Sequence, residues 1–279
     1  MRNKILSDIS EIFVDGMTLS DFCEEVDYNT HKVMYLFDSW TNAKVKAGVE
    51  EANKCPNCDK YYSRLSVHWN GCGEPELSEE QKSIITGAVM SDATVSVEGS
   101  VTMYSSNREF LEWMDEKLSF MSYGITLNDS GEDRHMRNIK AGFDVKREAN
   151  YKDIYRLSIP SHSFTKGLRK LYKKDGKELY TLNLNEDIIK VWYSGDGGLN
   201  WSDDKYAYPE IRAISQSKFD DKIDMMFDDF PVNSFVSNGN IRFYSDADDF
   251  LEMIGPSPKG MEYKWENKNR DRYNKLKPE

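Results

Sequence analysis

The hydrophobic positions near the N-terminus follow helical spacing. In ILSDISEIF, residues 5–13, apolar side chains recur at the intervals of an amphipathic helix. Gly16 interrupts this pattern, and a second short helix is expected over Leu19 to Val26 with Thr18 as its N-cap. The pattern therefore predicts two consecutive helices at the start of the chain.

A third helix is expected after the turn Asp27-Tyr28-Asn29, capped by Thr30 and running from His31 to about Trp40. Helix, tight turn and helix is the arrangement of helix-turn-helix DNA-binding domains. In that interpretation the residues that begin the groove-facing helix are Asn29, Thr30, His31 and Lys32. The alternative is a small three-helix packing domain, because this part of the chain is net acidic.

The segment CPNCDKYYSRLSVHWNGC has the spacing Cys-x2-Cys-x9-His-x3-Cys. Its candidate ligands are Cys55, Cys58, His68 and Cys72. Four sulfur and nitrogen donors complete the tetrahedral shell of Zn²⁺ and leave no open position, so we expect a structural zinc site. The alternative is a coincidental group of buried cysteines. Cys23 is expected to be a small core residue.

Composition narrows the class of protein. The 279 residues contain 30% charged side chains, and no apolar run is long enough to cross a membrane. The N-terminus lacks an apolar signal core, so a cytoplasmic protein of bacterial, phage or archaeal type is expected. The net charge is −11, but residues 134–177 carry 13 basic and 4 acidic side chains. A polyanion responds to this local field, so a nucleic acid partner stays compatible with the composition.

Two apolar segments end in an aspartate that is followed by a small residue. ITGAVMSDAT ends in Asp92-Ala93, and IKVWYSGDGG ends in Asp196-Gly197. Small residues on one side of each helix would let the two backbones approach closely. Two carboxylates would then meet at the negative ends of two helix dipoles, an unfavourable arrangement that a divalent cation relieves.

The segments after these helices also share a layout. In each, alternating strands lead into a helix, and an arginine in a later strand, Arg156 or Arg242, precedes a phenylalanine, Phe164 or Phe250. Ser78 and Gln81 form a capping box that starts the first copy. From about residue 80 to 265 the chain is therefore expected to contain two copies of one α/β unit.

These features resemble a single-chain LAGLIDADG homing endonuclease. Asp92 in TGAVMSDA and Asp196 in KVWYSGDG fall on the acidic motif position, and PSPKGMEYKW resembles a recurrent ending of that family. The first copy departs from the family in having Met90 within the motif and Ala93 in place of glycine. The resemblance implies an α+β fold with two pseudo-symmetric αββαββα repeats and saddle-shaped antiparallel sheets.

The resemblance also implies a site-specific nuclease. Asp92 and Asp196 would bind Mg²⁺ and serve one DNA strand each, leaving short 3′ overhangs. Arg156, Arg242 and Gln216 are candidates for tuning the catalytic pocket, with phosphate contact or a surface ion pair as the alternative. Further DNA contacts are expected from basic residues of both copies, which are Arg134, Arg137, Lys140, Lys146, Arg147, Arg212 and Lys264.

The expected organisation is a helical domain at 1–48, a zinc module at 49–76, a first repeat at 77–180 and a second repeat with a basic tail at 181–279. We expect a monomer that acts on a long double-stranded DNA target, either intron-borne or free-standing. A second hypothesis is a nuclease-derived DNA- or RNA-binding regulator or intron maturase without cleavage activity. A third is an acidic structural protein with a zinc clip.

Overall fold

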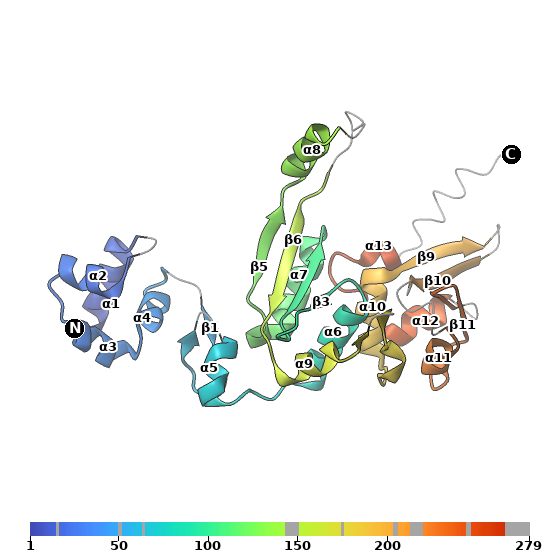
Figure 1. Ribbon diagram of the computed structural model, residues 1–279, viewed down its shortest axis with the longest axis horizontal. Coiled ribbons are helices and arrows are strands. Elements are labelled where there is room, and N and C mark those ends of the chain that lie inside the picture. The colour runs from blue at the N-terminus through green and yellow to red at the C-terminus, as the bar shows by residue number, and fades with distance from the viewer. Residues whose placement is uncertain are drawn as a thin grey trace. The chain divides into compact units, whose positions relative to one another are not determined.

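The computed structural model describes residues 1–14, 17–49, 52–62, 65–142, 151–173, 176–202, 206–212, 220–243 and 247–265 (Figure 1). The chain divides into two compact units, Met1–Glu76 and Leu77–Glu279. In the described part of the chain, no helix combines the length and the apolar character needed to span a bilayer.

Short helices build the first part of the N-terminal unit. Their bounds are α1 (Arg2–Ile12), α2 (Leu19–Glu25), α3 (Thr30–Phe37) and α4 (Trp40–Lys46). Ile5 and Ile9 of α1 pack against Phe22, Val33 and Phe37, and all five side chains are buried. The helical pattern predicted for residues 5–13 is confirmed, and Cys23 lies in this core as expected.

Local capping decides where these helices begin and end. Thr18 caps α2 in a capping box with Asp21, as the sequence predicted for the N-cap. The prediction for the third helix was wrong at both ends. Asn29, and not Thr30, is the N-cap of α3, and the helix stops at Phe37 because Asp38 adopts a left-handed φ of 64°.

The cysteine-rich segment completes the N-terminal unit. It comprises β1 (Asn53–Lys54), β2 (Tyr61–Tyr62) and α5 (Leu65–Cys72). The amide of Tyr61 donates a 2.8 Å hydrogen bond to Oδ1 of Asn42, whose side chain is buried in α4. Residues 1–48 and 49–76, expected as separate modules, thus share one compact unit.

The second unit begins with helix α6 (Glu79–Met90). Ser78 and Gln81 form the predicted capping box at the N-terminus of this helix. The elements that follow are β3 (Thr94–Val95), β4 (Val101–Ser105), α7 (Arg108–Leu118), the 3-10 turn η1 (Ser119–Met121), β5 (Ile125–Asp129), α8 (Gly131–Lys140), β6 (Ile154–Ile159) and α9 (Ser163–Arg169). A small hairpin of β7 (Tyr172–Lys173) and β8 (Gly176–Lys177) and the turn η2 (Leu179–Thr181) close this half.

The second half of this unit begins with α10 (Glu186–Asp196). It continues through β9 (Gly197–Ser202), β10 (Tyr206–Arg212), α11 (Asp220–Asp224), η4 (Met225–Phe227), β11 (Ser234–Ser237), β12 (Asn240–Phe243), α12 (Ala247–Ile254) and α13 (Glu262–Trp265). Its core joins Trp192 and Tyr193 of α10 to Phe243 and Phe250, and it also includes Met90 of α6.

Within the described residues, the unit contains two four-stranded antiparallel sheets with the same strand order. The first runs β3-β4-β6-β5 and the second runs β9-β10-β12-β11. In each half a helix precedes the first strand and another separates the second strand from the third (Figure 1). The expected mixture of helices with antiparallel sheets is confirmed.

Candidate functional site

Helices α6 and α10 pack along a seam of small residues. A Cβ atom on Gly87 would lie 2.6 Å from the Val191 Cβ, and one on Gly195 would lie 2.5 Å from the Ser91 Cβ. Asn185 donates a 2.9 Å hydrogen bond to the Ser83 hydroxyl at the start of the seam. Because these contacts advance together along both helices, α6 and α10 run in the same direction and end side by side.

Asp92 and Asp196 follow directly from this packing. Asp196 is the last residue of α10 and is half-buried, whereas Asp92 is exposed just beyond the end of α6. Their neighbours Gly195 and Ser91 are in contact, so both aspartates belong to the same end of the helix pair. This is the negative end of both helix dipoles, which concentrates negative charge there.

Lys264 of α13 compensates part of this charge. Its Nζ donates hydrogen bonds of 2.6 Å and 2.8 Å to the carbonyls of Ser194 and Gly195, and only 9% of the residue is exposed. Burial lowers the pKa of the ammonium to about 8, although the nearby carboxylates of Asp196 and Asp92 oppose this shift. The buried ammonium of Lys264 therefore interacts electrostatically with both Asp196 and Asp92.

The sequence led us to expect a DNA contact from Lys264. Its ammonium donates hydrogen bonds to carbonyls in the last turn of α10. The C-terminal end of a helix is a favourable position for a cation. The hydroxyl of the buried Tyr193 donates to the Lys264 carbonyl at 3.0 Å and fixes α13 in place. We therefore assign Lys264 to holding the end of α10.

A cavity of about 360 Å³ opens beside Asp196. Asn200, Glu210 and Arg212 also line it, together with the glycines that flank Asp196. Carboxylate and amide oxygens are the ligands that hard divalent cations prefer, so the donor set fits such an ion. Sequence reasoning missed Glu210. The alternation of Tyr208, Glu210 and Arg212 with buried Pro209 and Ile211 could have indicated that it shares the polar face of β10.

The two predicted arginines lie on corresponding strands of the two sheets. Arg156 of β6 pairs with Tyr104 of β4, and Arg242 of β12 pairs with Glu210 of β10. Arg242 donates from Nε to Glu210 at 2.7 Å, whereas Arg156 is exposed and has no acidic partner among the described residues. Of the alternatives given for these arginines, an ion pair is therefore what Arg242 forms, with Glu210 as its partner. Gln216 lies outside the described residues.

Ala93 adopts a backbone that its side chain tolerates. It is not among the described residues with a left-handed φ, so this position does not need the conformational freedom of a glycine. The hydroxyl of Tyr172 donates a 3.2 Å hydrogen bond to the Ala93 carbonyl. The exit from α6 is thus held by a neutral group, whereas an ammonium holds the end of α10.

The second candidate site is the cysteine and histidine cluster. The ligand atoms of Cys55, Cys58, His68 and Cys72 all lie within 4.8 Å of one another. Cys58 Sγ and His68 Nε2 are 3.3 Å apart, and the ring of Tyr62 stacks on His68 with a centroid separation of 3.6 Å. A tetrahedral zinc shell separates its donors by about 3.5 Å, so the predicted ligands fit this ion.

Electrostatics agree with a metal at this cluster. Desolvation and the adjacent Cys58 and Cys55 sulfurs raise the pKa of the Cys72 thiol to about 11. Deprotonated thiolates would repel one another here, and a bound cation removes that repulsion. All coordinating positions would be occupied by protein atoms, so the arrangement suits a structural ion and not a catalytic one.

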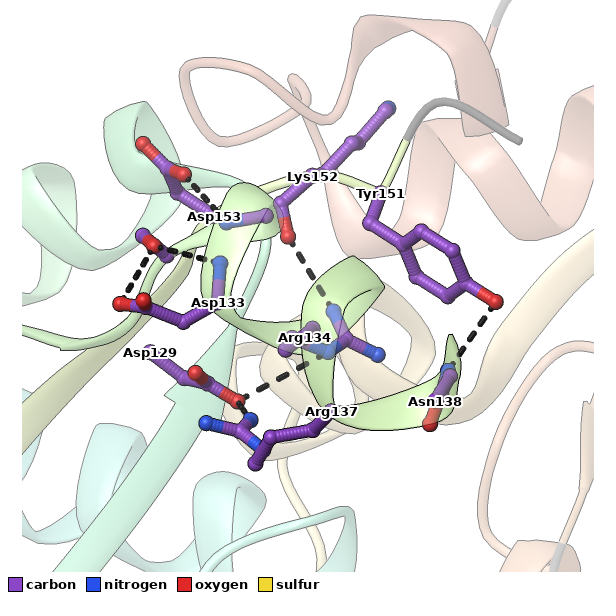
Figure 2. A network of polar contacts seen from close by, with 10 residues as sticks. Asp129, Asp133, Arg134, Arg137, Asn138, Tyr151, Lys152 and Asp153 are labelled. Carbon is purple, nitrogen blue, oxygen red and sulfur yellow. Dashed lines mark hydrogen bonds and ion pairs between the residues drawn. The ribbon is translucent and has the colours of Figure 1, made fainter. Parts of the chain in front are cut away.

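The polar network of α8 forms a third notable cluster (Figure 2). Helix α8 lies at the tip of the hairpin of β5 and β6 (Figure 1). Asp129 forms ion pairs with both Arg134 and Arg137, the former at 3.8 Å. The arginines predicted to contact DNA are thus partly neutralised, while Lys140 is exposed and Lys146 and Arg147 lie outside the described residues.

The same network attaches α8 to the start of β6. Asn138 donates a 3.0 Å hydrogen bond to the Tyr151 hydroxyl, and the Gly131 amide donates at 2.8 Å to Asp153 (Figure 2). Residues 129–140 and 151–153 together carry equal numbers of acidic and basic side chains. The described tip is therefore neutral, and the basic excess predicted from the sequence lies mainly in residues 156–177.

The predicted groove-facing residues lie at the start of α3. Asn29 uses its side-chain oxygen to accept from the Lys32 amide at 3.3 Å. Thr30 is half-buried, whereas His31 and Lys32 are exposed. The exposed face of this helix continues to Tyr35, which is 87% exposed.

Arg212 of β10, another residue predicted to contact DNA, is also exposed.

Comparison with known proteins identifies a similar fold. The homing endonuclease I-WcaI, solved bound to its DNA recognition sequence, superposes with a TM-score of 0.52 at 15% identity, over 68% of this chain and 88% of that chain. Full-length DUF199/WhiA from Thermatoga maritima gives a TM-score of 0.37 at 12% identity, over 74% and 64%. No protein-family model and no curated protein sequence matches the chain. The first similarity supports a homing-endonuclease-like fold.

Proposed function

We propose that this protein is a site-specific DNA endonuclease of the LAGLIDADG type that hydrolyses both strands of a long target and leaves short 3′ overhangs. The observation that carries the proposal is the joint ending of α6 and α10, which puts Asp92 and Asp196 at one end of the helix pair beside Lys264. The fold shared with a homing endonuclease that was solved on DNA supports it.

The two aspartates would hold divalent cations such as Mg²⁺. When bound, such an ion supplies Lewis-acid chemistry at a phosphodiester and lowers the pKa of its water. The chain's own contribution is to hold two carboxylates together at the C-terminal ends of two helices, where both helix dipoles are negative. Lys264 offsets enough of this charge for the helix ends to pack together.

The two αββαββα segments act as pseudo-symmetric repeats in this proposal. Their sheets lie as saddles in the major groove, and one aspartate serves each strand. Arg156, Arg242 and Gln216 tune the two catalytic pockets, while Arg134, Arg137, Lys140, Lys146, Arg147 and Arg212 contact DNA. Exposed arginine side chains on an antiparallel sheet can reach both phosphates and base edges.

The N-terminal unit extends the recognised site. Asn29, Thr30, His31 and Lys32 begin a helix that enters the major groove, and Cys55, Cys58, His68 and Cys72 bind a structural Zn²⁺. The zinc ion orders a segment too short to fold by burial alone. The protein acts as a monomer because both aspartates are present in one chain.

The test uses supercoiled plasmids that carry an uninterrupted version of the locus flanking the gene. With Mg²⁺, the wild-type chain should linearise the plasmid, Asp92→Asn and Asp196→Asn should each nick it, and the double variant should be inactive. If the wild type and the double variant bind the same DNA or RNA equally and neither cuts it, the protein is a binding protein and the endonuclease proposal is wrong.

A further inference from the structure

Glu210 is a buried carboxylate in the cavity beside Asp196. Only 7% of the residue is exposed, and its side chain lies 2.7 Å from Arg242 Nε and 3.9 Å from Arg212 Nε. Removing a carboxylate from water is unfavourable unless cations and hydrogen bonds compensate it. The burial of Glu210 next to Asp196 therefore carries a desolvation cost that the two arginines offset in part.

The first half of the unit has no counterpart of this charge. Two residues after Asp196, Gly198 pairs with Glu210 of β10, and two residues after Asp92, Thr94 pairs with Thr102 of β4. Thr102 is neutral and half-buried, and Tyr104, the strand partner of Arg156, is also neutral. Among the described residues, the second half therefore has a carboxylate that pairs with Arg242, whereas the first half has no such carboxylate beside Arg156.

The charge balance of the two halves differs as a result. Beside Asp196, two arginines would repel an incoming divalent cation, and Glu210 neutralises part of this repulsion. It also fixes Arg242 by a charge-assisted hydrogen bond, which is stronger and more directional than a neutral one. In the first half, Arg156 is exposed to solvent, which screens its charge.

We call the metal site formed around each aspartate the half-site of that aspartate. We propose that Glu210 is a positioning residue that orients Arg242 and makes the half-site of Asp196 bind its divalent cation more readily than the half-site of Asp92. This inference rests on the proposed endonuclease function. At limiting Mg²⁺, the strand served by Asp196 is cut before the strand served by Asp92, and nicked DNA accumulates as an intermediate.

The first experiment requires no DNA. Mn²⁺ is titrated against the full-length chain, and bound ion is followed by electron paramagnetic resonance. Glu210→Gln should weaken binding at the Asp196 half-site about tenfold, the size of effect usual when a partner of a metal site is lost. Glu210→Asp keeps the charge and should bind like the wild type. Tyr104→Phe, which changes the strand partner of Arg156 in the first sheet, should have no effect.

The second experiment follows each strand of an end-labelled target in single-turnover reactions over a range of Mg²⁺ concentrations. Glu210→Gln should raise the Mg²⁺ concentration for half-maximal cutting about tenfold for the Asp196 strand only. A general loss of structure would instead slow both strands without changing this concentration. Glu210→Asp should restore the wild-type dependence.

Equal Mn²⁺ binding by the wild type and Glu210→Gln overturns the inference, whether or not DNA is cut. An equal shift for both strands overturns it as well, because the effect would not belong to one half-site. If Glu210→Gln loses Mn²⁺ binding but the wild type cuts no target, the role of Glu210 stands and the endonuclease proposal fails.

Discussion

Gly195 lies against Ser91, so closely that a methyl group on Gly195 would be 2.5 Å from the Ser91 Cβ and 2.6 Å from its Oγ. This contact joins the last turns of α6 and α10. The aspartates that follow are held at one end of the helix pair because no side chain separates the two backbones. The distance between the carboxylates therefore depends on a glycine that has no chemical role of its own.

Gly195→Ala should lower the free energy of unfolding by about 1–3 kcal/mol, because the added methyl overpacks the seam. Chemical denaturation followed by tryptophan fluorescence measures this change. Gly167→Ala is the control, since a Cβ there meets nothing within 4 Å and alanine favours the helix. Adding Ser91→Gly to Gly195→Ala should recover most of the lost stability. Failure of this double variant to recover would show that the steric contact is not the cause.

Hydrophobic spacing and capping residues were enough to predict much of the fold. The apolar positions of residues 5–13 and the caps at Thr18 and Ser78 predicted local structure correctly. These signals act between neighbours in the chain. The third helix was predicted too long because the left-handed turn at Asp38 competes with a pattern that continues to Trp40.

The site was harder to predict because its partners are distant in sequence. Lys264 was expected to contact DNA, and only the packing of α13 shows that its ammonium donates hydrogen bonds to the carbonyls of α10. Glu210 acquires its partner Arg242 through strand register, which alternation alone does not fix. The cysteine and histidine ligands were predictable because their spacing already limits the geometry.

The zinc cluster predicts one bound ion per chain. Cys58→Ser should abolish stoichiometric zinc, measured by mass spectrometry of the native protein, and should lower the melting temperature of the N-terminal unit. Cys23→Ala is the matched control, because this buried cysteine belongs to the helical core and not to the cluster. Equal zinc content in wild type and Cys58→Ser would refute the assignment of the cluster.

Asp129→Asn should strengthen DNA binding. Asp129 pairs with Arg134 and Arg137, so removing its charge releases two cations toward phosphate. Each new phosphate contact should steepen the slope of log affinity against log salt by about 0.9. The loss of stability should be small, about 0–1 kcal/mol, because ion pairs near the surface contribute little. Fluorescence anisotropy with duplex DNA at several salt concentrations measures the slope.

Glu132→Gln controls for the change in net charge in that experiment. Glu132 is exposed on the same helix and has no ion-pair partner among the described residues. It should raise affinity less than Asp129→Asn does. If both variants bind DNA alike, general charge explains the effect and the two arginines are not the contacts.

Lys264→Met should destabilise the Leu77–Glu279 unit by about 1–3 kcal/mol at pH 7, because the buried carbonyls of Ser194 and Gly195 lose their donor. Denaturation in magnesium-free buffer measures this loss. Lys259→Met is the control, since that side chain is 65% exposed and lies 3.7 Å from Glu109 in a surface pair. A loss of similar size in both variants would mean that the buried hydrogen bonds of Lys264 add nothing specific.

The pH dependence of this effect has a defined sign. Burial lowers the pKa of Lys264 from 10.5 to about 8, so between these values the unfolded chain holds a proton that the folded chain has lost. Stability rises with pH wherever the unfolded state binds more protons. The wild type should therefore gain stability relative to Lys264→Met as the pH increases from about 8 toward 10.5, and the difference should be constant below pH 7. A difference that shrinks over the alkaline range would show that the ammonium is stabilised, not destabilised, by its place between α10 and the two aspartates.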